Sequence, residues 1–144
     1  MTDEHESADA VAPPPEDQLA FDVAEIAIVT FLQALAAGRP LVLLPFVMNG
    51  NFHHKSLICR ADDPMTPADL KGKRVAMRAY TQTTPTWVRG FLSDDYGVAI
   101  DQVEWLSKEP AHVEGYVEPG WVRQMEDDVP LEDMLRAGTV DAIL

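Results

Sequence analysis

Several features that would assign a protein to a class at once are missing from this sequence. Cys59 is its single cysteine, so no internal disulfide can form, and a cysteine-stapled secreted scaffold is excluded. No apolar run approaches the roughly 20 residues that a membrane-spanning helix needs. Bases are scarce, with 11 Lys and Arg against 24 Asp and Glu, and this balance argues against a general nucleic-acid binder.

The common nucleotide-binding and catalytic motifs are also absent. No GxGxxG, P-loop, HExxH, GxSxG or CxxC pattern occurs, so dinucleotide, nucleoside-triphosphate and zinc-protease functions lose their usual support. The N-terminus is acidic and has no basic segment followed by an apolar stretch, which argues against a secretory signal. We therefore expect a cytoplasmic protein with no cofactor, no bound metal, no membrane insertion and no nucleic-acid partner. The sequence leaves the oligomeric state open.

The charges that are present lie unevenly along the chain. Residues 1–38 hold eight acids and no base, residues 39–89 hold eight bases and three acids, and residues 90–144 hold thirteen acids and three bases. A basic middle section could receive a small anion. The same bases could equally be solvated surface charges that pair with the acidic flanks.

Strand and helix signals alternate along most of the chain. Residues 1–18, which are rich in acids and proline, are predicted to be a disordered tail, and residues 108–128 are irregular. Apolar runs predict strands at 19–23, 41–44, 56–60, 73–77, 102–106 and 140–144. Periodicity, prolines at helix starts and glycines at helix ends predict helices at 25–37, 85–96 and 131–137, and a short turn at 67–70. This alternation indicates an α/β protein with mainly parallel sheets.

Candidate functional residues follow the predicted strands. In open α/β sheets, ligands bind beyond the carboxyl ends of the strands, beside helix N-termini. Glu25 follows the first strand and opens a helix, where it could serve chemistry or simply complement the helix dipole. Thr83 and Thr84 precede Pro85, where they could bind an anion or act as plain helix caps, and Tyr80 lies just before them.

Two histidines and two residues of the 85–96 helix complete the candidates. His53 and His54 suit acid–base work or a structural role, and adjacent histidines are not a usual metal-chelating pattern. Arg89 could bind a carboxylate through two parallel hydrogen bonds or pair with a surface acid. Trp87 could form a ligand platform, although a core position is the commoner role.

Several segments then resemble a known family. They are FDVAEI, NFHHKS, TPADLKGKRVAM, TWVRGFLSDDYGV, VEWL and LRAGTVDAIL, in this order, and the match covers about residues 20–144. The chain resembles 4,5-dihydroxyphthalate decarboxylase-like proteins, which are similar to type 2 periplasmic substrate-binding proteins. The resemblance implies two α/β lobes around a cleft, with residues 19–62 in the first lobe and 63–144 in the second, and an incomplete fold. The chain departs from the family pattern at Lys55, Ala79 and Pro85, which leaves the exact substrate open.

The resemblance also implies a function. It is the non-oxidative decarboxylation of a small anionic aromatic dicarboxylate to a phenolic acid and carbon dioxide, a carbon–carbon lyase reaction of phthalate catabolism. His54 would be the general acid, His53 the second choice, and Glu25 would orient it or take the phenol proton. The retained carboxylate would bind to Thr83, Thr84 and Arg89, beside a wall of Tyr80 and Trp87. The alternatives are a non-catalytic solute-binding protein of an ABC-type transporter for a small organic anion, and an inactive truncated remnant.

Overall fold

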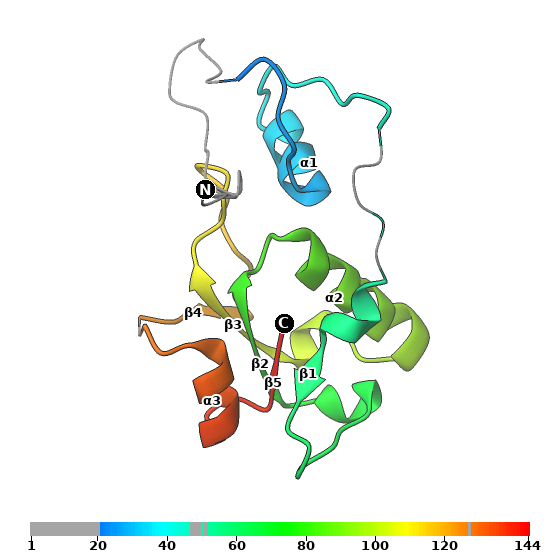
Figure 1. Ribbon diagram of the computed structural model, residues 1–144, viewed down its shortest axis with the longest axis vertical. Coiled ribbons are helices and arrows are strands. Elements are labelled where there is room, and N and C mark those ends of the chain that lie inside the picture. The colour runs from blue at the N-terminus through cyan, green and yellow to red at the C-terminus, as the bar shows by residue number, and fades with distance from the viewer. Residues whose placement is uncertain (1–20, 47–49, 51, 127) are drawn as a thin grey trace, which may run out of the picture.

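The structure is a computed structural model and describes residues 21–46, 50, 52–126 and 128–144. These residues form one five-stranded sheet flanked by helices (Figure 1). The strand order is β1-β5-β2-β3-β4. The strands are β1 (Ile58–Cys59), β2 (Arg74–Ala79), β3 (Glu104–Glu109), β4 (Val122–Gln124) and β5 (Ala142–Ile143).

The pairing of the strands confirms an α/β fold with a mostly parallel sheet. β2 runs parallel to both β3 and β5, and β3 runs parallel to β4. In this register Val75 of β2 lies opposite Trp105 of β3 and Ala142 of β5. Only the short edge strand β1 is antiparallel, where it pairs with β5.

Alternate residues of the central strands pack against helices on opposite faces of the sheet, as the twofold period of a strand requires. On one face Val75 and Met77 join Trp105 against α2 (Thr83–Tyr96). On the other face Ala76 and Leu106 pack against α3 (Leu131–Ala137). The sheet is therefore the middle layer between α2 and α3, and its parallel strands end on the same side.

A further helix, α1 (Ile28–Ala36), lies beyond the carboxyl ends of β2 and β3 (Figure 1). It packs against α2, and the ion pair between Arg39 and Glu114, 4.0 Å apart, links the segment after α1 to the β3–β4 connection. The described residues also form three short 3₁₀ helices, namely η2 (His53–Ser56), η3 (Pro67–Leu70) and η4 (Ile100–Gln102). α1 and η2 both reach the N-terminal half of α2, which makes this the place where distant segments meet.

Two expected strands are wrong. Residues 41–44 form no strand, and Val42 is 85% exposed. Residues 21–23 of the expected 19–23 strand are likewise irregular and exposed, while residues 19 and 20 lie outside the described residues. A strand needs a neighbour to receive its hydrogen bonds, and within the described chain the sheet edges are β1 and β4 rather than either segment. The disorder predicted for residues 1–18 also lies outside the described residues.

Helix ends were predicted better than helix starts. Gly97 and Gly138 adopt left-handed conformations, with φ of 62° and 71°, directly after α2 and α3 as expected. α1 begins at Ile28, however, so Glu25 does not open it. α2 begins at Thr83 with Gln82 as N-cap, so the expectation that Thr84 caps this helix is wrong. Strand β4 within the expected irregular region 108–128 was missed.

Candidate functional site

Two segments far apart in the sequence meet at the start of α2. Nδ1 of His53 in η2 lies 3.1 Å from Oγ1 of Thr84, the second residue of α2, and the contact is partly buried. Because Thr84 does not cap the helix, its hydroxyl is available for this hydrogen bond. The contact places one of the predicted acid–base residues beside one of the predicted anion-binding residues.

The two histidines lie along one face of α2 in different surroundings. The ring of His53 lies parallel to that of Trp87, with centroids 6.3 Å apart and an interplanar angle of 5°. The ring of His54 stacks directly on Phe91, with centroids 4.0 Å apart and an angle of 12°. Trp87 is 58% exposed whereas Phe91 is 9% exposed, so His53, itself half-buried, lies beside an exposed ring, and the exposed His54 covers a buried one.

Tyr80 and Arg89 form a separate cluster beneath α2. Arg89 is 8% exposed, and its guanidinium carbon lies 3.7 Å from the centre of the Tyr80 ring. Its Nη1 donates to the Tyr80 carbonyl at 2.9 Å and its Nη2 to Oγ1 of Thr86 at 3.0 Å. Burial lowers the pKa of Arg89, while Tyr80 and Glu118 nearby oppose this shift.

Tyr80 is held from several sides. It is 5% exposed, its hydroxyl accepts a hydrogen bond from Nε1 of Trp121 at 3.0 Å, and its backbone N–H donates to Oγ of Ser107 at 3.2 Å. The guanidinium N–H groups of Arg89 that form hydrogen bonds in this structure therefore donate to other groups of the protein. That Arg89 binds a carboxylate and that Tyr80 lines a cleft both stay predictions.

Two hydroxyls between β2 and the first turn of α2 have no partner among the described residues. Oγ1 of Thr81 and Oγ1 of Thr83 are buried without a hydrogen bond, and Thr81 as a whole is only 2% exposed. A buried polar group without a partner is unfavourable, and few occur in folded proteins. A helix start also carries free N–H groups and a partial positive charge, so this turn has unused capacity to bind an anion.

The last predicted catalytic residue lies apart from this site. Glu25 is exposed in the segment before α1 and has no hydrogen bond or ion pair with another described residue. The structure thus brings His53, Thr84 and Trp87 together and places Thr83 in the same helical turn. It does not join Glu25 to either histidine.

Comparison with known proteins fits the motifs found in the sequence. No protein-family model matches the chain. The chain is homologous to 4,5-dihydroxyphthalate decarboxylases. It is 28% identical over 139 residues to the enzyme of that name from Comamonas testosteroni, covering 86% of this chain and 40% of the relative. It is 30% identical over 139 residues to the one from Pseudomonas putida, covering 86% and 52%. The chain therefore spans about half the length of these decarboxylases, or less.

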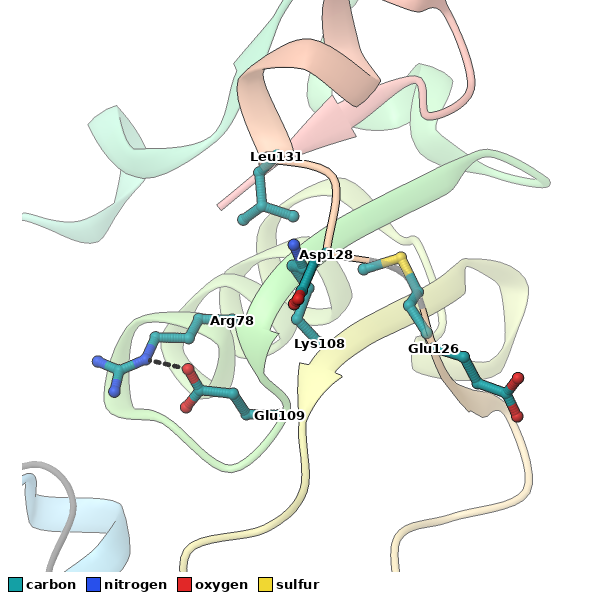
Figure 2. A pocket seen from close by; sticks show the side chains of 7 residues that line it. Arg78, Lys108, Glu109, Glu126, Asp128 and Leu131 are labelled. Atoms are coloured by element: carbon teal, nitrogen blue, oxygen red, sulfur yellow. Dashed lines mark hydrogen bonds and ion pairs between the residues drawn. The ribbon is translucent and has the colours of Figure 1, made fainter.

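A hollow that the sequence did not predict lies at the carboxyl ends of β2 and β3. Figure 2 shows it on the α3 side, with Arg78 and Glu109 at the ends of β2 and β3. Nε of Arg78 lies 2.8 Å from Oε1 of Glu109, and Nζ of Lys108 donates to the Val129 carbonyl. Because its lining also includes the acids Glu126 and Asp128, the hollow has no excess of positive charge to attract the dicarboxylate that the decarboxylase relatives act on.

The residues that the structure describes contain no group of three or more His, Cys, Asp or Glu side chains that could hold a metal ion. Among them, no helix combines the length and the apolar character that crossing a bilayer requires.

Proposed function

We propose that the chain contributes the substrate-binding and proton-donating site of a decarboxylase that acts on an aromatic dicarboxylate such as 4,5-dihydroxyphthalate. The observation that carries this proposal is the contact of His53 with Thr84 at the first turn of α2, in a chain homologous to such enzymes. A proton donor and an anion-binding turn are the two groups that this reaction requires. The proposed location is the cytoplasm.

The anion-binding part of the proposal uses the start of α2. The free N–H groups of the first turn and the hydroxyls of Thr83 and Thr84 would bind the carboxylate that remains on the ring. Arg89 would add positive charge from beneath the helix, and its direct contact with the carboxylate remains a proposal. The exposed indole of Trp87, one turn further along α2, would support the aromatic ring.

The proposed reaction is driven by the substrate's own hydroxyl groups. A hydroxyl para to the leaving carboxylate supplies electron density to the ring, and an imidazolium transfers its proton to the carbon that bears the carboxylate. The bond from that carbon to the carboxylate then breaks, its electron pair restores the aromatic ring, and carbon dioxide leaves. The products are a dihydroxybenzoate and carbon dioxide. No oxidant is consumed, and the histidine regains its proton from water.

The two-lobe organisation is part of the same proposal. Residues 19–62 would belong to the first lobe and residues 63–144 to the second, with the cleft between them. β1, from the first part, pairs with β5 at the edge of the sheet, so the two parts are joined by backbone hydrogen bonds as well as by the chain.

A turnover and binding experiment tests this function. The 144-residue protein is incubated with 4,5-dihydroxyphthalate while carbon dioxide release is measured, and phthalate serves as a control that has both carboxylates but no hydroxyl to supply electrons. We expect release from the first compound and binding without release for the second. Binding of both without release would favour a solute-binding protein, and binding of neither would favour an inactive remnant; each result would contradict the decarboxylase proposal.

A further inference from the structure

We infer that His53, and not His54, is the histidine that faces the ligand, and that Thr84 is the residue that positions it. This inference rests on the proposed function, because it assigns the proton donor within the same site. It reverses the order of preference that the family resemblance implies, in which His54 comes first.

The first observation is that one nitrogen of His53 is fixed while the other is not. Nδ1 of His53 contacts Oγ1 of Thr84 at 3.1 Å, whereas Nε2 has no hydrogen-bond partner among the described residues. A histidine that acts on a substrate commonly has this arrangement, since the bond at one nitrogen sets the orientation of the ring and the other nitrogen does the chemistry. Thr84 would occupy the place that a carboxylate or carbonyl fills in other sites.

The second observation is the position of His53 relative to the anion-binding turn. Its partner Thr84 belongs to the first turn of α2, beside the unpartnered hydroxyl of Thr83. The Thr84 hydroxyl can accept from Nδ1–H of His53 and donate its own hydrogen to a bound carboxylate. The half-buried ring of His53 and the exposed ring of Trp87 are parallel, with centroids 6.3 Å apart, beside the first two turns of α2.

His54 lacks each of these features. Its ring lies flat on Phe91, and Phe91 makes an edge contact with Tyr96 at 6.3 Å between centroids. Phe91 follows Thr84 by seven residues, which corresponds to about 10 Å along a helix axis. His54 therefore lies near the middle of α2, away from the turn that would hold the carboxylate, where its exposed ring covers Phe91.

The proton balance follows from this arrangement. In the imidazolium form Nδ1–H of His53 donates to Oγ1 of Thr84, and Nε2–H transfers its proton to the ring carbon of the substrate as the bond to the carboxylate breaks. The neutral ring keeps its hydrogen on Nδ1, because that bond to Thr84 persists, and Nε2 takes a proton from water. When the Thr84 hydroxyl donates its hydrogen to the bound carboxylate, it can only accept from Nδ1–H of His53, and this arrangement favours the tautomer that leaves Nε2 ready for the next turnover.

The test compares four variants and a control variant by turnover and by nitrogen NMR of the histidine rings. Replacing His53 by Gln should lower the rate of carbon dioxide release by about 100-fold or more, the usual contribution of a general acid. His54→Gln should have a much smaller effect. Thr84→Val keeps the shape of the side chain but removes the hydroxyl, and it should lower kcat by about 10- to 100-fold through lost orientation. Thr84→Ser should restore most of that loss. Thr139→Val, which removes a threonine hydroxyl bonded to the Met134 carbonyl, is the matched control and should leave turnover unchanged.

The NMR measurement separates positioning from a merely structural role. In the unaltered protein and in Thr84→Ser, we expect the Nδ1–H tautomer of His53 to predominate, whereas Thr84→Val should give a mixture. Turnover that survives His53→Gln but not His54→Gln would overturn the inference, and so would an unchanged His53 tautomer in Thr84→Val.

Failure of the proposed function is distinguishable from failure of this inference. If the unaltered protein releases no carbon dioxide, the decarboxylase proposal fails, and the NMR titration is repeated with phthalate as the probe. A larger change at Nε2 of His53 than at either nitrogen of His54 would still support His53 as the ligand-facing histidine. An equal or absent change would overturn it.

Discussion

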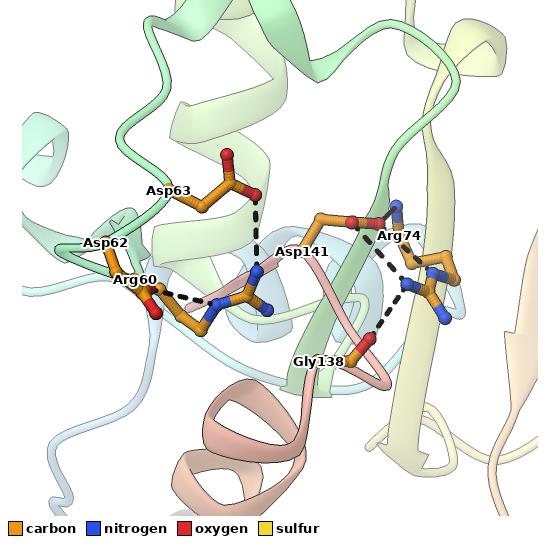
Figure 3. Close-up of polar contacts among 6 residues, drawn as sticks. All are labelled: Arg60, Asp62, Asp63, Arg74, Gly138 and Asp141. Atoms are coloured by element: carbon orange, nitrogen blue, oxygen red, sulfur yellow. Dashed lines mark hydrogen bonds and ion pairs between the residues drawn. The ribbon is translucent and has the colours of Figure 1, made fainter.

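The pairing of Arg74 with Asp141 offers the sharpest test of what holds the sheet together. Asp141 accepts hydrogen bonds from the backbone N–H of Arg74 at 2.9 Å and from its Nε at 3.1 Å. Nη2 of Arg74 also donates to the Gly138 carbonyl at 3.1 Å (Figure 3). These contacts fasten the first residue of β2 to the residue just before β5, next to the parallel pair of Val75 and Ala142. We therefore predict that Asp141→Asn destabilises the fold.

The expected magnitude follows from the number and exposure of these bonds. A hydrogen bond to a charged group contributes about 1.5–3 kcal/mol when it is shielded. The side chains of Arg74 and Asp141 are 38% and 20% exposed, so solvent screening reduces the contribution, and asparagine keeps one acceptor oxygen. We expect a loss of about 1–2 kcal/mol in the free energy of unfolding. The Arg136–Asp133 pair is as short, at 2.8 Å, but its side chains are 76% and 56% exposed. Asp133→Asn is therefore the matched control, with an expected loss of about 0.5 kcal/mol or less.

The pH dependence of the difference gives an independent check. Partial burial acts to raise the pKa of Asp141, but the hydrogen bonds and charge of Arg74 outweigh it and hold the pKa below its ordinary value. A carboxyl group whose pKa is lower in the folded state stabilises the fold above its unfolded pKa of about 3.9, and this stabilisation is lost as the pH falls through the folded pKa. The difference between the unaltered protein and Asp141→Asn should therefore be full at pH 5 to 7 and shrink below about pH 4.

Urea unfolding followed by circular dichroism measures both quantities, with the slope checked for constancy between variants. A loss at neutral pH no larger than that of the Asp133→Asn control would refute the role assigned to the Arg74–Asp141 pair. A difference that grows as the pH falls below 4 would refute the electrostatic explanation even if the loss at neutral pH were as expected.

Three further predictions concern single positions. Gly138 has φ of +71° and an added Cβ would lie 3.0 Å from Nη1 of Arg60, so Gly138→Ala should lower the free energy of unfolding by about 1–2 kcal/mol, and an unchanged thermal midpoint would contradict this. Arg89→Met leaves the Tyr80 carbonyl without its hydrogen-bond donor and should lower the free energy of unfolding by about 1–3 kcal/mol. Urea unfolding measures this loss, and Arg89→Lys should recover only part of it. Iodide should quench the fluorescence of Trp87 and Trp121, which are 58% and 44% exposed, but not of Trp105, which is 0% exposed; Trp87→Phe should reduce the quenched component, and an unchanged component would contradict the exposure of Trp87.

The parts of the fold that were predicted from sequence are those with short-range signals. Thr66 and Asp69 form a reciprocal capping box around Pro67, and both members lie within four residues of one another. The left-handed glycines after α2 and α3 likewise act on the turn that precedes them. Such signals depend on the local backbone alone, so the structures that they predict do not depend on tertiary contacts.

The strands that were predicted incorrectly show what local sequence signals cannot determine. Leu41 to Leu44 are apolar, and an apolar run indicates a preference for burial, but strand formation also needs a neighbouring strand in register. The converse error is β4, because Val122–Gln124 is only three residues long and is polar at two positions. Its place in the sheet comes from pairing with Trp105 to Ser107 of β3, about seventeen residues earlier, which no local pattern encodes.

The candidate site shows the same distinction within a single residue. The sequence before Pro85 predicts that the hydroxyl of Thr84 caps the helix, which would consume it in a bond to a nearby backbone N–H. α2 instead starts at Thr83, so Thr84 lies inside the first turn and its hydroxyl meets His53, 31 residues earlier in the chain. A small shift in where the helix begins thus changes Thr84 from a cap into the partner of a titratable ring. The same contact is what favours His53 over His54 in our inference, because the hydroxyl that meets His53 belongs to the first turn of α2, where an anion would bind. The role that we propose for His53 therefore depends on a tertiary contact, and the comparison of Thr84→Val with Thr84→Ser tests that contact directly.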